Sequence, residues 1–152
     1  MAQIQKTSSP LRYKISEILI LEEIKSLISF GFKDISLFKK NADLKVDYYF
    51  SNPNWEKFYL DNNLYMIDPC VQGLFATNAL MIPWGTLPQK EMDSRQKICR
   101  IETGLSILDK KDSERSLMGH LGGDEKFITT LLSSQEGLKD LFLIFKKIAD
   151  RI

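Results

Sequence analysis

The chain has 152 residues, of which 43% are hydrophobic and 27% are charged, and its 21 basic and 20 acidic residues leave a net charge of +1. This length fits one domain with its own hydrophobic core. The even charge balance excludes the clustered basic excess of a typical nucleic-acid-binding domain.

Cysteine content and hydropathy indicate a cytoplasmic protein. Cys70 and Cys99 are too few for a disulfide framework or a zinc cluster, which fits a reducing compartment. The first ten residues lack the apolar run of a signal peptide. The longest apolar stretch, Ile18–Leu21, is too short to span a membrane.

The N-terminal third is predicted to form a helix and then a β-hairpin. Residues 1–9 are polar and expected to be loose, and Ser9-Pro10 is a candidate helix start. An amphipathic helix of about four to five turns is expected to follow and to stop at Gly31. Its apolar positions are Ile15, Ile18, Leu19, Ile24, Leu27 and Ile28. Asp34–Lys40 and Leu44–Phe50 are predicted strands, antiparallel because only the short turn 41–43 joins them.

The middle of the chain is predicted to hold short helices. Asn52-Pro53 begins one that runs through Tyr59, and Asp68-Pro69 begins another that runs through Phe75. Residues 76–87 are expected to be irregular. Residues 88–101 are charged on most sides and are predicted to form a surface helix.

A second hairpin and further helices complete the chain. Thr103–Leu108 and Arg115–Leu121 are predicted strands joined by a charged turn, and Gly122-Gly123 is expected to close the second strand. From Asp124 the pattern is helical, with Gly137 expected to separate two pieces. Adjacent antiparallel pairs predict an α+β fold, an α-β-α sandwich with a central antiparallel sheet flanked by helices.

Enzyme motifs are sparse. No dinucleotide-binding glycine pattern, phosphate loop or metal-ligand cluster is present, so we expect no cofactor and no metal. The lone histidine, His120, is more typical of a structural residue than of a catalyst. An enzyme that uses His120 with Cys70 or Cys99 is the least favoured hypothesis.

The residues between Ser51 and Trp84 favour a small-molecule pocket. Trp55 and Tyr59 are four residues apart and share one helix face, and Asp68 follows nine residues later. A buried Trp offers one N–H donor, whereas a buried Asp needs a donor. Together they suit a ligand with one carbonyl and one N–H. The spacing equally fits a purely structural role, in which Asp68 caps a helix and the aromatic rings fill the core.

The order Trp55, Tyr59, Asp68-Pro69 and Trp84, followed by Gly104-Leu105-Ser106, resembles the signal-binding domain of LuxR-type quorum-sensing transcription regulators. The expected order of helices and hairpins resembles that family too. The resemblance implies a PAS/GAF-like sandwich that buries an acyl-homoserine lactone between sheet and helices. It also implies one autoinducer-binding-like domain over residues 1–152. Family regulators continue into a helix-turn-helix DNA-binding domain, and here the chain departs from the family, because we expect no such domain within it.

The resemblance assigns roles to individual residues. Trp55 would donate to the lactone carbonyl, Asp68 would accept from the amide N–H of the ligand, and Tyr59 and Trp84 would pack around the head group. Ser51 stands where lactone-binding members usually have a Tyr, and on the second hairpin Gly119 stands where they often have a hydroxyl, with Ser116 nearest. Gly104 would be structural. The implied ligand-binding set is Trp55, Tyr59, Asp68, Trp84, Ser51 and Ser106.

Two functions follow from this resemblance. The first is a cytoplasmic signal-sensing domain that binds an acyl-homoserine lactone or a similar small molecule and is not an enzyme. The alternative is a stand-alone interaction module that dimerises with a full-length regulator and modulates it without a ligand. In both cases we expect a homodimer or heterodimer, no membrane attachment, and no direct DNA binding by this chain.

Overall fold

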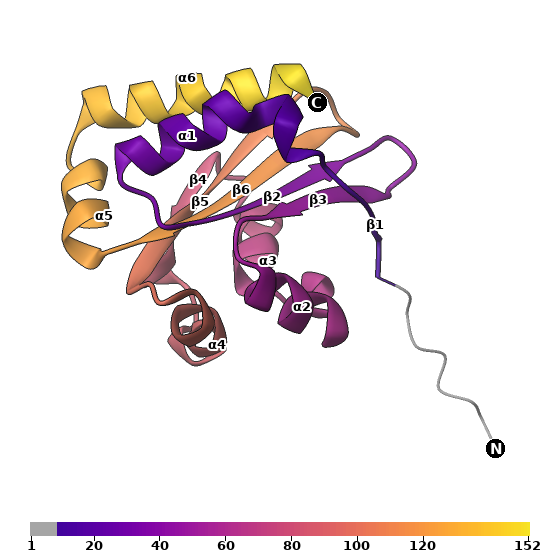
Figure 1. Cartoon of the computed structure of the whole chain (residues 1–152), viewed down its shortest axis with the longest axis horizontal. Coiled ribbons are helices and arrows are strands. Elements are labelled where there is room, and N and C mark those ends of the chain that lie inside the picture. The colour runs from indigo at the N-terminus through magenta and orange to yellow at the C-terminus, as the bar shows by residue number, and fades with distance from the viewer. Residues whose placement is uncertain (1–8) are drawn as a thin grey trace.

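A computed structural model describes residues 9–152 and shows one mixed sheet between two layers of helices (Figure 1). The strands are β1 (Leu11–Lys14), β2 (Asp34–Lys40), β3 (Val46–Phe50), β4 (Met81–Pro83), β5 (Thr103–Lys110) and β6 (Ser116–Gly123). Their order across the sheet is β1-β3-β2-β6-β5-β4, and only the β1–β3 pair is parallel. The expectation for residues 1–8 lies outside the described residues.

Each face of the sheet carries its own helices (Figure 1). One face is covered by η1 (Glu17–Ile20), α1 (Leu21–Phe30), α5 (Glu125–Leu132) and α6 (Gln135–Arg151). The other is covered by α2 (Pro53–Asp61), η2 (Leu64–Met66), α3 (Pro69–Thr77), η3 (Trp84–Thr86) and α4 (Gln89–Cys99). Within residues 9–152, no helix is both long and apolar enough to cross a bilayer.

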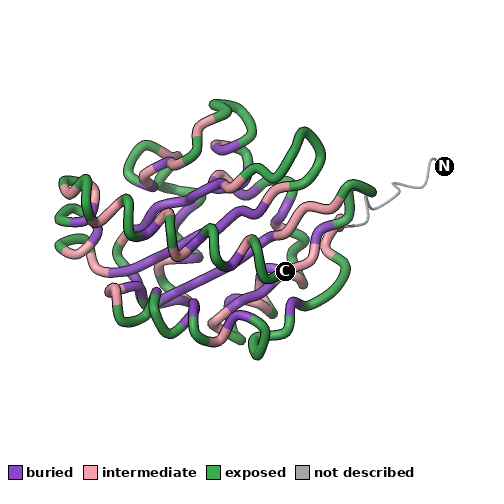
Figure 2. The backbone as a smooth tube through the Cα atoms, turned by 90° about the horizontal axis from the view of Figure 1, so that it is seen from above, coloured by how far each residue is buried: buried purple, intermediate pink, exposed green. Residues whose placement is uncertain are grey.

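Two hydrophobic cores result, because alternate residues of a strand point to opposite faces. On β2, Leu37 packs into the core under α1 and α6, whereas its neighbour Phe38 packs into the core with α2 and α3. Ile107 and Leu108 on β5 divide in the same way. Figure 2 shows the central strands buried along most of their length. The second core holds both tryptophans, Trp55 and Trp84.

The structure confirms the α-β-α sandwich and both predicted hairpins, β2–β3 and β5–β6. The two Pro-initiated helices are present as α2 and α3. Gly31 ends α1 with a φ of 132°, and its N–H donates to the carbonyls of Leu27 and Ile28. Local capping signals therefore predicted these elements correctly.

The predicted helix start at Pro10 was wrong. Residues 11–14 instead form β1, and helical structure begins at Glu17. The edge of β3 explains the difference, because the Val46 N–H donates to the Pro10 carbonyl and the Ile15 N–H donates to the Tyr48 carbonyl. Local sequence does not encode this long-range pairing.

Three further boundaries differ from the prediction. Residues 81–86, expected to be irregular, form the edge strand β4 and η3, and Pro83 is tolerated there because an edge strand needs fewer donors. The pair Gly122-Gly123 lies inside β6. The last two helices separate at Ser133–Ser134 because the Ser134 hydroxyl accepts from the Gly137 N–H at 3.0 Å, which places Gly137 in the first turn of α6.

The structural role expected of Gly104 is confirmed, and it yields a stability prediction. A Cβ at Gly104 would lie 2.3 Å from the Leu121 carbonyl oxygen and 2.7 Å from the Trp84 ring. We expect Gly104→Ala to lower the free energy of unfolding by about 1–3 kcal/mol, measured by urea denaturation. The control is Gly85→Ala, because a Cβ there meets nothing within 4 Å. Equal stability of the two variants would contradict the close contact.

Candidate functional site

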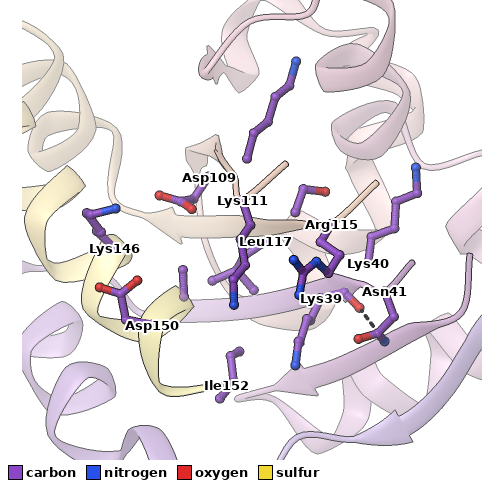
Figure 3. Close-up of a pocket in the computed structure, with 13 residues that line it drawn as sticks. Lys39, Lys40, Asn41, Asp109, Lys111, Arg115, Leu117, Lys146, Asp150 and Ile152 are labelled. Carbon is purple, nitrogen blue, oxygen red and sulfur yellow. Dashed lines mark hydrogen bonds between the residues drawn. The ribbon is translucent and has the colours of Figure 1, made fainter. Parts of the chain in front are cut away.

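One hollow of about 250 Å³ lies where the ends of β2, β5 and β6 meet α6 (Figure 3). Its charged lining residues are mostly basic, with Lys39, Lys40, Lys110, Lys111, Arg115 and Lys146 against Asp109 and Asp150. None of these side chains is buried, so each keeps its hydration. Because a specific ligand site needs fixed polar groups in an apolar wall, we do not assign this hollow as the candidate site.

A second hollow of about 140 Å³ lies among α2, η2, α3 and α4. Its lining is largely aromatic and apolar and consists of Trp55, Tyr59, Leu64, Ile67, Asp68, Pro69, Glu91 and Arg95. Three predicted site residues therefore meet at this hollow. We take it as the candidate functional site.

Local capping positions these residues. The Asn52 side chain accepts from the backbone N–H groups of Asn54 and Trp55 at 2.9 and 3.0 Å, which starts α2 and fixes Trp55 in its first turn. Asp68 starts α3 in the same way, by accepting from the Cys70 N–H at 2.9 Å. Asp68 therefore caps α3, as the purely structural interpretation of the sequence predicted.

Asp68 is also the centre of a buried polar cluster. Its Oδ1 accepts from Cys70 N and from Arg95 Nη1 at 3.1 Å. Its Oδ2 accepts from the Tyr59 hydroxyl at 2.7 Å and from Arg95 Nη2 at 2.9 Å. A carboxylate offers about four lone-pair positions, so the protein itself fills them all.

Arg95 is the residue that the sequence interpretation missed. It is 2% exposed, and its guanidinium carbon lies 5.0 Å from the centroid of the Trp55 ring and 5.3 Å from that of Trp84. Its Nη1 also lies 2.9 Å from the Cys70 sulfur. The guanidinium thus donates to Asp68 between two aromatic rings, which is the position that the resemblance assigns to a ligand head group.

The expectation of a charged surface helix was correct for most of α4 but wrong for this residue. Arg95 lies three residues after Met92 and four before Cys99, and all three side chains are buried. Residues at this spacing share one helix face. A basic residue within this apolar helix face is the sequence signal from which a buried ion pair could have been predicted.

Electrostatics hold the pair in its ionised form. Burial alone would raise the pKa of Asp68, but the charge and hydrogen bonds of Arg95 outweigh it and lower this pKa to about 2. Burial acts against the charge of Arg95, yet the Asp68 carboxylate holds its pKa above the ordinary value. Burial and Asp68 together raise the pKa of Tyr59, which keeps its hydroxyl a donor.

Two buried donors at the hollow have no partner among residues 9–152. They are Trp55 Nε1 and Arg95 Nε. An unpaired buried donor costs about 1–3 kcal/mol, so both favour an acceptor beside them. The unpaired buried side-chain atoms of the site are therefore donors, whereas its buried carboxylate, Asp68, is saturated.

Trp84 and Ser106 belong to an adjoining cluster with His120. The Trp84 indole donates to Ser106 Oγ at 2.9 Å, and Ser106 Oγ lies 2.7 Å from His120 Nδ1. Burial lowers the pKa of His120 to about 3, so the ring is neutral at pH 7. This cluster fixes the indole ring that Arg95 packs against.

Ser51 lies in a different environment. Its hydroxyl accepts from the Ile35 N–H at 2.9 Å and donates to Asp34 at 3.4 Å, where it ties the end of β3 to β2. It is not among the residues that line the hollow. No contact between Ser51 and Asp68 or Trp55 therefore supports the ligand-binding role that the resemblance assigns to Ser51.

The geometry does not favour cysteine chemistry. Burial raises the pKa of both Cys70 and Cys99, which keeps them as weakly nucleophilic thiols. The Cys70 sulfur contacts Arg95 and Met92, whereas His120 contacts Ser106. Across the described part of the chain, no group of three or more His, Cys, Asp or Glu residues is arranged to hold a metal ion.

Comparison with known proteins finds similarity in structure only. No family model and no curated protein sequence matches the chain. CepR2 of Burkholderia cenocepacia, described as an N-acylhomoserine lactone-dependent LuxR-family transcription factor, matches with a TM-score of 0.59 and 12% identity, over 87% of this chain and 97% of that chain. The chain shares the fold of LuxR-family regulators.

Two structures of SdiA share this LuxR-type fold. Escherichia coli SdiA matches with a TM-score of 0.57 and 14% identity, over 86% of this chain and 62% of that one. SdiA in complex with octanoyl-rac-glycerol matches with a TM-score of 0.55 and 15% identity, over 74% of this chain and 49% of that one. The chain thus spans about half to three-fifths of the SdiA chains.

The Asp68 pair predicts a specific acid response. The folded-state pKa of about 2 lies below the ordinary value of about 3.9, so its stabilisation is complete above about pH 4 and is lost as the pH falls toward 2. We expect this group to contribute about 2–3 kcal/mol of that loss. Urea unfolding across this range should show a shallower pH dependence for Asp68→Asn than for the wild type.

His120 also weakens the fold in acid because burial lowers its pKa. It is present in both proteins, but the Asp68 carboxylate raises its pKa, so the comparison reports on Asp68 together with its effect on His120. Parallel pH profiles for the two proteins would contradict an ionised, Arg-paired Asp68.

Proposed function

We propose that the domain senses a small-molecule signal in the hollow beside Trp55, as part of a LuxR-type quorum-sensing regulator. The observation that carries this proposal is Trp55, a 3% exposed residue that lines the hollow and whose buried indole N–H has no partner among the described residues. An apolar, aromatic wall with few fixed polar groups is typical of small-ligand sites. The ligand would be an acyl-homoserine lactone or a related acyl compound.

In this proposal Trp55 donates to a carbonyl of the ligand, and Tyr59 and Trp84 supply the aromatic walls. Ser106 acts indirectly by fixing the Trp84 indole. Asp68 would accept from a ligand amide only if Arg95 moved, because its lone pairs are already used. In the observed arrangement Asp68 instead holds Arg95 against the two tryptophans.

The volume of the hollow limits what binds without rearrangement. A cavity of about 150 Å³ holds one benzene-sized molecule, so the 140 Å³ beside Trp55 fits a ring but not a ring with a long acyl tail. The tail would have to leave past Leu64 and Ile67, which line the hollow, and Ile67 is 69% exposed. Short-chain ligands are therefore favoured.

Ligand binding should raise the melting temperature, because the ligand binds only the folded state. We expect Trp55→Phe to keep the aromatic wall but to weaken binding by roughly fivefold to tenfold, since it removes one hydrogen bond worth about 1 kcal/mol. Thermal shift with a panel of short acyl lactones and acyl esters tests this, with native mass spectrometry as the second readout.

Tyr13→Phe is the matched control, because this side chain is 66% exposed on β1. Absence of any ligand-induced shift in folded wild-type protein would contradict the sensor proposal. It would leave the interaction module as the function to pursue.

Association with a second copy or with a full-length regulator forms the second part of the proposal, with the cytoplasm as its location. It is supported by exposed apolar side chains on the α1 and α6 side of the sheet. They are Ile18 at 79%, Leu19 at 54%, Ile28 at 56% and Leu143 at 52% exposure.

We expect dimers in sedimentation analysis and their loss in Ile28→Glu, because a charge would have to be buried in the interface. Leu44→Glu, at a 66% exposed position in the β2–β3 loop, is the control that should leave the dimer intact. A monomeric wild type that captures no full-length regulator would contradict this part.

A further inference from the structure

We infer that the hollow beside Trp55 selects a neutral head group that only accepts hydrogen bonds, such as an ester, lactone or ketone, over one that carries an amide N–H. This inference rests on the proposed sensor function and names the chemistry of its ligand. It follows from which hydrogen-bonding groups of the site are already used and which are open.

The acceptor side of the site is closed. Asp68 is the buried carboxylate at the hollow, and Cys70, Tyr59 and two nitrogens of Arg95 occupy its lone pairs. A ligand N–H would therefore find no free carboxylate oxygen. The rim carboxylate of Glu91 is exposed and stays hydrated.

The donor side of the site is open. Trp55 Nε1 and Arg95 Nε are both buried, both belong to lining residues, and neither has a partner within residues 9–152. Arg95 thus takes over the donor role that an amide would play toward Asp68, and its Nε–H stays without a partner at a residue that lines the hollow. A carbonyl or ester oxygen is the complementary group.

Charge restricts the ligand further. Arg95 is already neutralised by Asp68 at 2.9 Å, and Glu91 adds a negative charge at the rim. A ligand carboxylate would be buried without a counterion of its own, at a large desolvation cost. The complementary ligand is therefore neutral.

A matched ligand pair tests the inference in the wild-type protein. N-butanoyl-homoserine lactone and the butanoyl ester of α-hydroxy-γ-butyrolactone differ only in an N–H against an ester oxygen. Calorimetry at pH 7 should show the ester binding roughly tenfold or more tightly, because the amide N–H would be buried unpaired.

Variants at Arg95 should change this preference. Arg95→Met frees the Asp68 oxygens, so we expect the amide to bind more tightly than the ester. Removing one partner of a buried ion pair can unfold a protein, so a second variant is needed. Arg95→Lys keeps the positive charge but loses the planar guanidinium and its Nε donor. It should reduce the ester preference. Lys97→Met, exposed on the same helix, is the control and should leave the preference unchanged.

Each outcome decides between the two ideas. Equal or tighter binding of the amide by the wild type overturns the inference but leaves the sensor function standing. Binding of neither ligand overturns the inference, and the sensor function fails with it only if the wider acyl panel also gives no shift. An ester preference that persists in both Arg95 variants would also overturn it, because the preference would then not come from Arg95.

Discussion

The ion pair between Asp68 and Arg95 is the interaction on which the helical layer beneath the sheet depends. It joins the start of α3 to the middle of α4, and the Tyr59 hydroxyl adds α2 to the same carboxylate. Removing two charges from water costs several kcal/mol per ion, which only good geometry and complete hydrogen bonding offset. Here the carboxylate is fully bonded and the guanidinium lies against two indole rings, which adds cation–π attraction.

The same pair occupies part of the space between the aromatic rings of the candidate site. The aromatic frame of Trp55, Tyr59 and Trp84 is present, but a protein side chain occupies the space between the rings. The Arg95 guanidinium therefore fills part of the site. What remains is a small hollow lined by two residues with unpaired buried donors, Trp55 Nε1 and Arg95 Nε.

Local signals in the sequence predicted most of the fold, whereas contacts between distant segments were not predictable. Asn52-Pro53 and Asp68-Pro69 encode their own helix starts, because the capping side chain and the capped N–H groups are two or three residues apart. β1 escaped prediction because its partner strand begins more than thirty residues later. Arg95 escaped because its partner lies 27 residues earlier, so its burial depended on how α3 and α4 pack.

The small volume beside Trp55 depends on the packing of α4, which contributes Glu91 and Arg95 to its lining. Arg95 is held by Asp68 on one side and by the Trp84 ring on the other, and Trp84 in turn is fixed by Ser106 on the central sheet. A ligand that needs more room than about 140 Å³ must move α4 or the segment around Ile67, and its apparent affinity falls by the fraction of time that the site is open. Of these two, the segment around Ile67 is the easier to displace, because Ile67 is 69% exposed whereas Arg95 is 2% exposed and paired with Asp68. If the proposed sensor function holds, Ile67 would limit the size of the ligand and Arg95 would select its head group.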